Sequence, residues 1–348
     1  MCKRIGMVWK NKEAESEIEV VQPRVLNYSP LSLTCSNTKT PTTPTTSEYP
    51  TLILFGNQTN FDYNDLLYKL KAILRGPIKT IRWLPGQYFT TLQSLCYGLR
   101  EFEKAAHPFK ANEIVRSNIL NYTLFLEYQN NACIAFAHAL LYSREFNQMS
   151  LTDRALLFNH SWPFFSAIEK IFHSLQTFGY DSPEVLIFSD NKHAANEEFA
   201  RVICDQMDEK RSLHIFELFR PSNEHMLNCL YKPMKALKLD LIEFTYIIGQ
   251  VLWSEEIAGF SQEGMKLARN IIISLNNDIH GYYCFNKNLS NYSYRLSQIV
   301  KLINQVHAQM SIKSEVMTAG RIFDLFDAGQ FYSEKLDLNN PGLIYLMK

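Results

Sequence analysis

The sequence has no excess of charge of either sign and no long apolar run. Its 348 residues include 35 Lys and Arg and 35 Asp and Glu, and the pI is about 7.1. Binding to nucleic-acid phosphates needs a basic face, so this balance argues against direct binding to DNA or RNA. No segment approaches the roughly 18 consecutive apolar residues that span a bilayer, so we expect no membrane association.

Cysteine and histidine pairs with metal-binding spacing are also missing. The seven cysteines lie far apart, none of them in a C-x2-C pair, and the nine histidines show no paired spacing. Structural zinc sites are built from such closely spaced pairs. We therefore expect no metal and no resident cofactor.

Sequence motifs for catalysis are absent as well. There is no Gly-rich phosphate loop, no G-x-S-x-G and no H-E-x-x-H. Catalytic groups can still be assembled in space, so an enzyme with an apolar pocket remains the weakest of three hypotheses. The sequence predicts a binding protein rather than an enzyme.

The sequence is rich in apolar residues at helical spacing. Hydrophobic residues make up 46% of the chain, enough for a large core. The periodicity predicts an all-α protein with one short strand at 185–188. The predicted helices cover 64–75, 92–106, 112–146, 152–177, 193–213, 235–260 and 291–310.

The most specific pattern lies between Ala139 and Trp162, where a short break separates two helical segments. Read from periodicity alone, it is a helix–turn–helix core element, with Ser150 or Thr152 as the cap of the second helix. The order of residues resembles the signature of nuclear-receptor ligand-binding domains, although Arg154 stands where that family usually has Gln. The signature positions are Phe146, Met149, Asp153, Leu157, Phe158 and Trp162.

The resemblance implies a fold and a domain organisation. It predicts a three-layer antiparallel helical sandwich with one small β-hairpin over residues 51–348. Cys2 to Met7 resembles the end of a receptor DNA-binding domain, so 1–7 is interpreted as a remnant of it. Residues 8–50, rich in Thr, Pro and Ser towards the end, are predicted to be a flexible hinge.

A second stretch, Lys235 to Phe260, is apolar nearly all round, as expected of a helix buried between neighbours. Glu243 within it carries a charge that is costly to bury without a partner. The resemblance implies an ion pair with Arg295 at the start of a later helix. The alternative is an exposed Glu243 without a partner.

The resemblance also implies an apolar cavity for a lipophilic small molecule. Its predicted lining includes Phe136, Phe165 and His173, where His173 occupies the place of an arginine in acid-binding receptors. The alternative for His173 is a hydrogen-bonded core residue.

A coregulator groove is the second implied binding site, into which a partner lays an amphipathic, Leu-rich helix. Activating receptors hold that helix with a basic and an acidic residue, but here those places are Leu141 or Asn159 and Leu346. Arg144, one turn from Leu141, is a candidate for a basic replacement. The predicted groove residues are Leu141, Arg144, Asn159, Leu343, Ile344, Leu346 and Met347.

The segment 291–310 has apolar residues at alternating steps of four and three, the period of helices that pack along their length. Such a seam predicts either a dimer interface or packing inside the domain, and the resemblance favours the dimer. Its residues are Tyr292, Leu296, Ile299, Ile303, Val306 and Met310.

Together these features predict a nuclear transcription regulator that is repressive or ligand-independent. Its expected partners are a second receptor, as homodimer or heterodimer, and coregulators, with corepressors favoured. DNA would be reached only through a partner or an upstream domain. The alternative is an all-α scaffold or adaptor unrelated to transcription.

Overall fold

The structure is a computed structural model, which describes residues 63–79, 81, 89–196, 201–203, 209–254 and 256–322. All of these belong to one compact unit, Pro50–Lys348. The predicted remnant at 1–7, the hinge at 8–50 and the groove positions Leu343, Ile344, Leu346 and Met347 lie outside the described residues.

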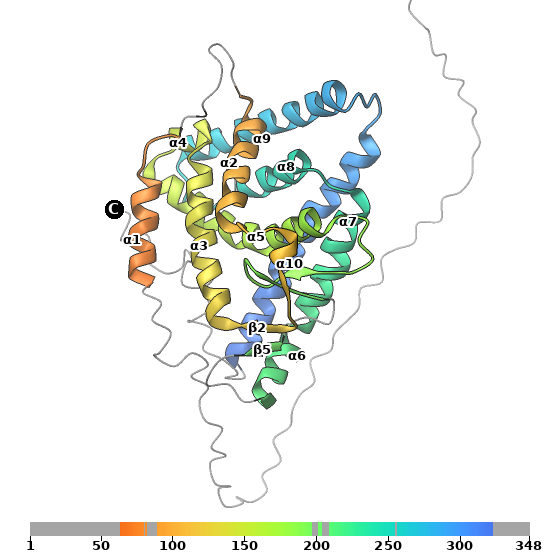
Figure 1. Ribbon diagram of the computed structural model, residues 1–348. Helices are drawn as coiled ribbons and strands as arrows, with labels where there is room; N and C mark the ends of the chain where they lie inside the picture. Colours follow the sequence, from red (N-terminus) through yellow and green to blue (C-terminus); the bar gives the residue numbers. More distant parts are fainter. Residues whose placement is uncertain are drawn as a thin grey trace, which may run out of the picture. The chain divides into compact units, whose positions relative to one another are not determined.

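The described chain is mostly helical, as predicted (Figure 1). The α-helices are α1 (Tyr63–Leu74), α2 (Thr91–Ala106), α3 (Tyr122–Leu140), α4 (Arg144–Gln148), α5 (Leu151–Phe178), α6 (Glu209–His225), α7 (Lys232–Leu237), α8 (Leu241–Leu252), α9 (Gln262–Gly281) and α10 (Ser293–Ile322). A 3-10 turn, η1 (Ala111–Glu113), precedes the first strand, and two π-helical segments, η2 (Met226–Tyr231) and η3 (Tyr282–Asn286), follow α6 and α9. No described helix combines the length and apolar character needed to cross a bilayer.

The helices form three layers. Helices α2 and α3 pack together on one side, α5, α8 and α9 form the middle, and α6, α7 and α10 lie on the other side (Figure 1). Helix α8 is apolar nearly all round because it is covered from both sides, by α2 and by α10. The predicted three-layer helical sandwich is confirmed.

Close approach of α2 and α3 depends on Gly98. A Cβ atom at this position would lie 2.4 Å from the backbone oxygen of Ala139, so no larger residue fits without separating the helices. The outer layer is therefore fixed by backbone contact as well as by side-chain packing.

One predicted helix begins later than expected. A helix from Asn112 is wrong, because α3 starts at Tyr122, where the side chain of Asn121 accepts hydrogen bonds from the backbone N–H of Thr123 and Leu124. The helix also ends earlier, at Leu140, and Ser143 caps α4 as a separate helix.

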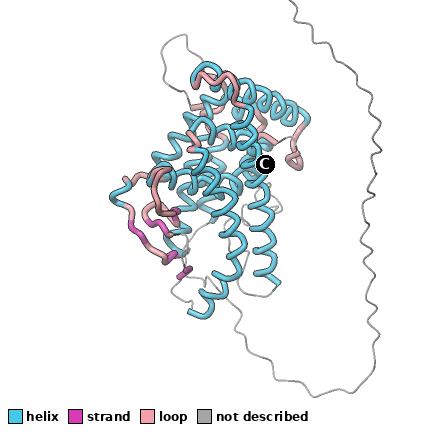
Figure 2. Tube along the Cα trace, turned by 90° about the vertical axis from the view of Figure 1, so that its right-hand side faces the viewer, coloured by secondary structure: helices cyan, strands magenta, loops and turns pink. Residues whose placement is uncertain are grey.

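The strand content is larger than predicted (Figure 2). The predicted hairpin is present as β3 (Ile187–Phe188) and β4 (His193–Ala195), paired antiparallel. In addition, β1 (Val115–Arg116) pairs parallel with β4, and β2 (Ile119–Asn121) pairs parallel with β5 (Arg201–Ile203). The predicted helix over 193–213 is therefore wrong, since this segment contributes two strands and α6 begins at Glu209.

Candidate functional site

Asp153 of the signature joins the beginnings of two helices. Its carboxylate accepts hydrogen bonds from the hydroxyl of Ser150, the N-cap of α5, and from the backbone N–H and hydroxyl of Ser261, the N-cap of α9. The side chain of Asp153 is buried. It fits beside Gly264 because that residue has no side chain: a Cβ atom at position 264 would lie 3.0 Å from Cγ of Asp153. A negative charge at two helix N-termini is favourable, so Asp153 holds α5 against α9.

Arg154, the departure from the family pattern, has a structural role of its own. Its guanidinium donates to the backbone oxygens of Leu74 at 3.0 Å, Asn147 at 2.6 Å and Met149 at 3.3 Å. These oxygens lie at the C-terminal ends of α1 and α4, where a cation is favourable. Arg154 therefore ties α1 and α4 to the first turn of α5.

The remaining signature residues are core residues. All five are buried, and Phe136 of α3 lies against two of them, with ring centroids 5.9 Å from both Phe158 and Trp162. These residues are Phe146, Met149, Leu157, Phe158 and Trp162. Their contribution is packing between α3, α4 and α5.

Glu243 and Arg295 are brought together as the resemblance implied. Glu243 is fully buried, and its two oxygens accept from Nε and Nη2 of Arg295, the latter at 2.6 Å. Tyr283 donates to the same carboxylate at 2.8 Å, and burial raises the pKa of that phenol. The charge of Glu243 is thus compensated, and the alternative of an exposed carboxylate is wrong.

His173 lies in a buried polar cluster that the sequence did not predict, formed with Glu103, His107, Tyr128 and Glu169. The rings of His107 and His173 stack with centroids 3.7 Å apart. His107 Nε2 lies 3.0 Å from Glu169, which also accepts a hydrogen bond from the hydroxyl of Tyr128. His173 Nδ1 lies 3.3 Å from Glu103.

The electrostatics of this cluster follow from its burial. Burial lowers the pKa of His107, and this effect outweighs the neighbouring carboxylate of Glu169, which raises it. The contact with His173 lowers the pKa of the Glu103 carboxyl. Each imidazole has a carboxylate close to it, Glu169 for His107 and Glu103 for His173, which offsets the cost of placing a polar ring in the core.

A sequence signal for the cluster exists but is weak. Glu103 of α2 and His107, the C-cap of α2, are four residues apart, and Glu169 and His173 are four apart on α5. In the structure, His107 pairs with Glu169 and His173 pairs with Glu103, so each pair joins two segments. The spacing within one helix therefore does not predict the pairs.

The space beside His173 is small. The cavity there, lined by Phe165, His107 and His173 among others, has a volume of about 20 Å³, room for about one water molecule. Phe165 fills much of it, stacked on Phe136 at 4.2 Å and edge-on to Phe102 at 4.8 Å. Sites for small-molecule ligands usually measure about 300–1,000 Å³.

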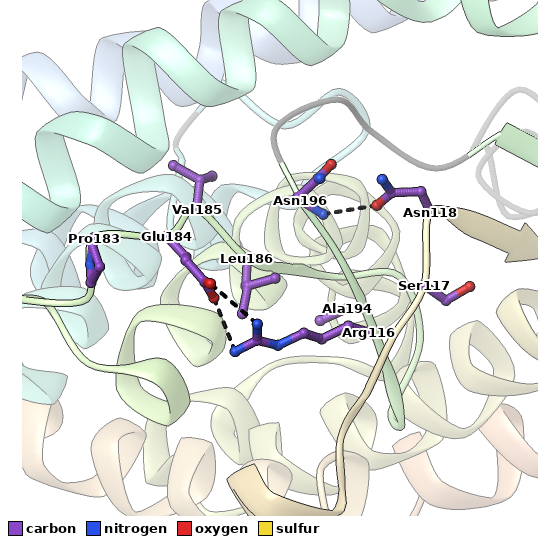
Figure 3. A pocket seen from close by; sticks show the side chains of 9 residues that line it. All are labelled: Arg116, Ser117, Asn118, Pro183, Glu184, Val185, Leu186, Ala194 and Asn196. Atoms are coloured by element: carbon purple, nitrogen blue, oxygen red, sulfur yellow. Dashed lines mark hydrogen bonds and ion pairs between the residues drawn. The ribbon is translucent and has the colours of Figure 1, made fainter.

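A larger pocket, of about 530 Å³, opens at the surface beside the hairpin (Figure 3). Its apolar wall is Pro183, Val185, Leu186 and Ala194. Across it, the exposed side chains of Arg116 and Glu184 form an ion pair at 3.0 Å. This pocket is distinct from the predicted site around His173.

The predicted groove positions differ in exposure. Among the groove positions that the structure describes, Leu141 and Asn159 are buried and Arg144 is exposed. The amide of Asn159 has no hydrogen-bond partner on either atom. Neither Leu141 nor Asn159 is open for a partner to bind.

The seam on α10 packs mostly inside the domain. Ile299 and Val306 are fully buried, and Tyr292, Leu296 and Ile303 lie against the same core, while Met310 is half-buried. The core therefore covers Ile299 and Val306, which cannot contact a partner, while the other four seam residues stay partly exposed and the dimer surface stays a prediction. In the part of α10 with described side chains, the exposed large apolar residues are Tyr294, Val300 and Ile322, which lie among polar residues.

Metal binding has no support among the residues that the structure describes, which hold no group of three or more His, Cys, Asp or Glu suited to an ion.

Comparison with known proteins identifies the family. Residues 111–323 match the model of the ligand-binding domain of nuclear hormone receptor. Nuclear hormone receptor family member nhr-213 of Caenorhabditis elegans is 23% identical over 296 residues, which cover 82% of this chain and 66% of the relative. Family member nhr-54 of the same organism is 24% identical over 252 residues, 68% of this chain and 57% of the relative.

Among solved structures, the Ultraspiracle ligand binding domain from Drosophila melanogaster is similar to 74% of this chain, over 98% of its own length, with 13% identity and a TM-score of 0.49. The chain spans about half to two thirds of the length of the curated relatives it matches. Receptors of this family are ligand-regulated transcription factors and not enzymes; they are generally nuclear, dimerise and bind coregulators. Because the family model covers the signature and all three helical layers, this chain belongs to the nuclear hormone receptor family through its ligand-binding domain.

Proposed function

We propose that the chain regulates transcription in the nucleus through protein–protein contacts of its ligand-binding domain, without a lipophilic ligand at the His173 site. The observation that carries the proposal is the filled space there, about 20 Å³ between stacked imidazoles and Phe165. A ligand would have to displace aromatic core residues and break the buried hydrogen bonds of His107 and Tyr128 with Glu169, which is costly.

We further propose that the domain represses or stays silent rather than activates. The basic positions that would hold an activating helix are Leu141 and Asn159, both buried and uncharged. Each lost charge-assisted contact weakens binding by about 1.5–3 kcal/mol. A corepressor helix that relies on apolar contacts is affected less.

The partner receptor, which would provide the route to DNA, is proposed to bind the solvent side of α10. That side presents Val300 next to polar residues such as Ser297 and Asn304. A mostly polar face with few exposed apolar residues suits a reversible association rather than an obligate dimer.

Ligand independence is tested by tethering the full chain to an unrelated DNA-binding domain at a reporter gene. We expect basal or reduced transcription, equal in lipid-replete and lipid-stripped medium. Native mass spectrometry of the purified chain is expected to show no bound lipid. Several-fold activation that requires lipid, or a stoichiometric lipid adduct, would refute the proposal.

A variant with an enlarged cavity gives the positive control. Phe165→Ala removes the ring that fills the site, so a lipophilic fluorescent probe should bind this variant and not the wild type. Equal binding of the probe to both proteins would show that the wild-type site is already open.

A further inference from the structure

Helix α1 is an amphipathic helix that precedes the region matched by the family model. Leu66, Leu70 and Leu74 are at most 4% exposed, whereas Tyr68 on the opposite side is 74% exposed. The buried residues repeat every four positions, with Leu67 and Ile73 half-buried beside them. This is the pattern of a helix that lays one apolar face into a groove.

The segment of α1 lies against the predicted coregulator groove at Leu141. Helix α1 packs against α3, whose C-cap is Leu141, and against α5, which carries Asn159 (Figure 1). Immediately after the helix, the backbone N–H of Lys79 donates to the oxygen of Leu141 at 3.0 Å. Gly76 lies so close that a Cβ there would be 3.7 Å from Cδ1 of Leu141.

The C-terminal end of α1 is held by a positive charge. Arg154 donates to the oxygen of Leu74 at 3.0 Å, where a cation matches the negative end of the helix dipole. A basic residue at position 141 would serve this purpose for a partner helix. In this chain the cation comes from α5 instead and already contacts the chain's own helix.

We propose that α1 is a built-in partner helix that occupies the coregulator groove, so that a coregulator helix binds only after α1 is displaced. The inference rests on the proposed function, because it assigns a means of regulation to the same groove. The occupant is the segment 63–79 of this chain, and its competitor is an amphipathic helix with Leu at equivalent spacing.

The test uses a fluorescein-labelled peptide with the sequence of residues 63–79 as the probe and full-length chain as the receptor. Wild type should bind the probe weakly, because α1 occupies the site. Leu70→Asp/Leu74→Asp should bind it at least about tenfold more tightly in fluorescence anisotropy, a difference that is readily measured. Tyr68→Asp/Ala72→Asp, which adds the same charge to the exposed side, should behave as wild type.

Competition then identifies the site. An unlabelled peptide with a Leu-x-x-Leu-Leu core should displace the probe from the Leu70→Asp/Leu74→Asp protein. Failure to displace it, or equal probe affinity for wild type and this variant, would overturn the proposal. Neither outcome depends on lipid binding or reporter repression, so failure here is distinct from failure of the proposed function.

If the double variant does not fold, hydrogen exchange of the wild type decides instead. A saturating Leu-x-x-Leu-Leu peptide should remove protection from the amides of α1 and leave those of α2 unchanged. Two outcomes would overturn the proposal. In the first, the peptide binds and the protection of α1 stays unchanged. In the second, no binding is detected at the highest peptide concentration.

Discussion

At the scale of single residues, the buried ion pair between Glu243 and Arg295 is the interaction whose loss should be most costly. Arg295→Met leaves the fully buried carboxylate without its charge partner. We expect a loss of about 3–5 kcal/mol in the free energy of unfolding, measured by urea denaturation monitored by circular dichroism.

Arg220→Met is the matched control. Arg220 pairs with Glu217 on the surface, with both side chains about half exposed, so its loss should cost less than about 1 kcal/mol. Similar losses for the two variants would show that Glu243 is solvated or has another partner.

At the scale of secondary-structure elements, contact between α2 and α3 makes Gly98 irreplaceable. Gly98→Ala places a methyl group 2.4 Å from the oxygen of Ala139, so the helices must separate. We expect a loss of about 1–3 kcal/mol, read from the thermal midpoint.

Gly281→Ala serves as the comparison within a helix. The nearest atom to a Cβ at this position is 3.9 Å away, on Phe285. This change should be neutral or add about 0.4–1 kcal/mol, because alanine restricts the unfolded chain. A stabilising Gly98→Ala would contradict the close packing of α2 and α3.

The elements that depend on local signals could be predicted from the sequence. Ser150 followed by Asp153 marked the start of α5, and the apolar pattern around Glu243 marked a buried helix that needed a cation. Here cap, charge and periodicity act within a few residues of one another.

The elements that depend on distant partners could not be predicted. The strand Ile119–Asn121 is formed by pairing with Arg201–Ile203, about 80 residues away, so local propensity favoured a helix in both places. The same holds for His107 with Glu169, and for α1, whose sequence indicates an amphipathic helix but not the surface it covers.

At the scale of the whole molecule, histidines that are buried or half-buried should make stability depend on pH. Burial lowers the pKa of His107, His138 and His160 below the ordinary value of about 6.5. Below that value the unfolded chain binds more protons than the folded one. The free energy of unfolding should therefore fall as the pH is lowered from about 7 towards 5.

His107→Gln should make this fall shallower, because it removes one of the three groups, the one beside Glu169, Glu103, Tyr128 and His173. His214→Gln, at an exposed position, is the matched control substitution. Urea denaturation at several pH values measures both. An unaltered slope for His107→Gln would mean that the pKa of this imidazole is the same in the folded and the unfolded protein.

Assembly of the molecule is tested on the two sides of α10. Ile299→Glu buries a charge in the core and should cost about 4 kcal/mol or more, lowering the thermal midpoint steeply. Val300→Glu, on the 45% exposed side, should keep the fold and weaken pairing in sedimentation velocity. A folded Ile299→Glu protein with altered sedimentation would restore the seam as the interface.

The covalent connection between α1 and the rest of the domain has a consequence for competition. Only 16 residues separate Leu74 at the end of α1 from Thr91 at the start of α2. A segment tethered this closely has an effective local concentration on the order of millimolar. A free partner at micromolar concentration therefore needs roughly a thousandfold advantage in intrinsic affinity, about 4 kcal/mol, before it occupies half of the molecules. The domain would thus bind abundant or multivalent partners and not scarce ones. The partner concentration at which binding begins is then set by the length of the connection between α1 and α2 rather than by a ligand.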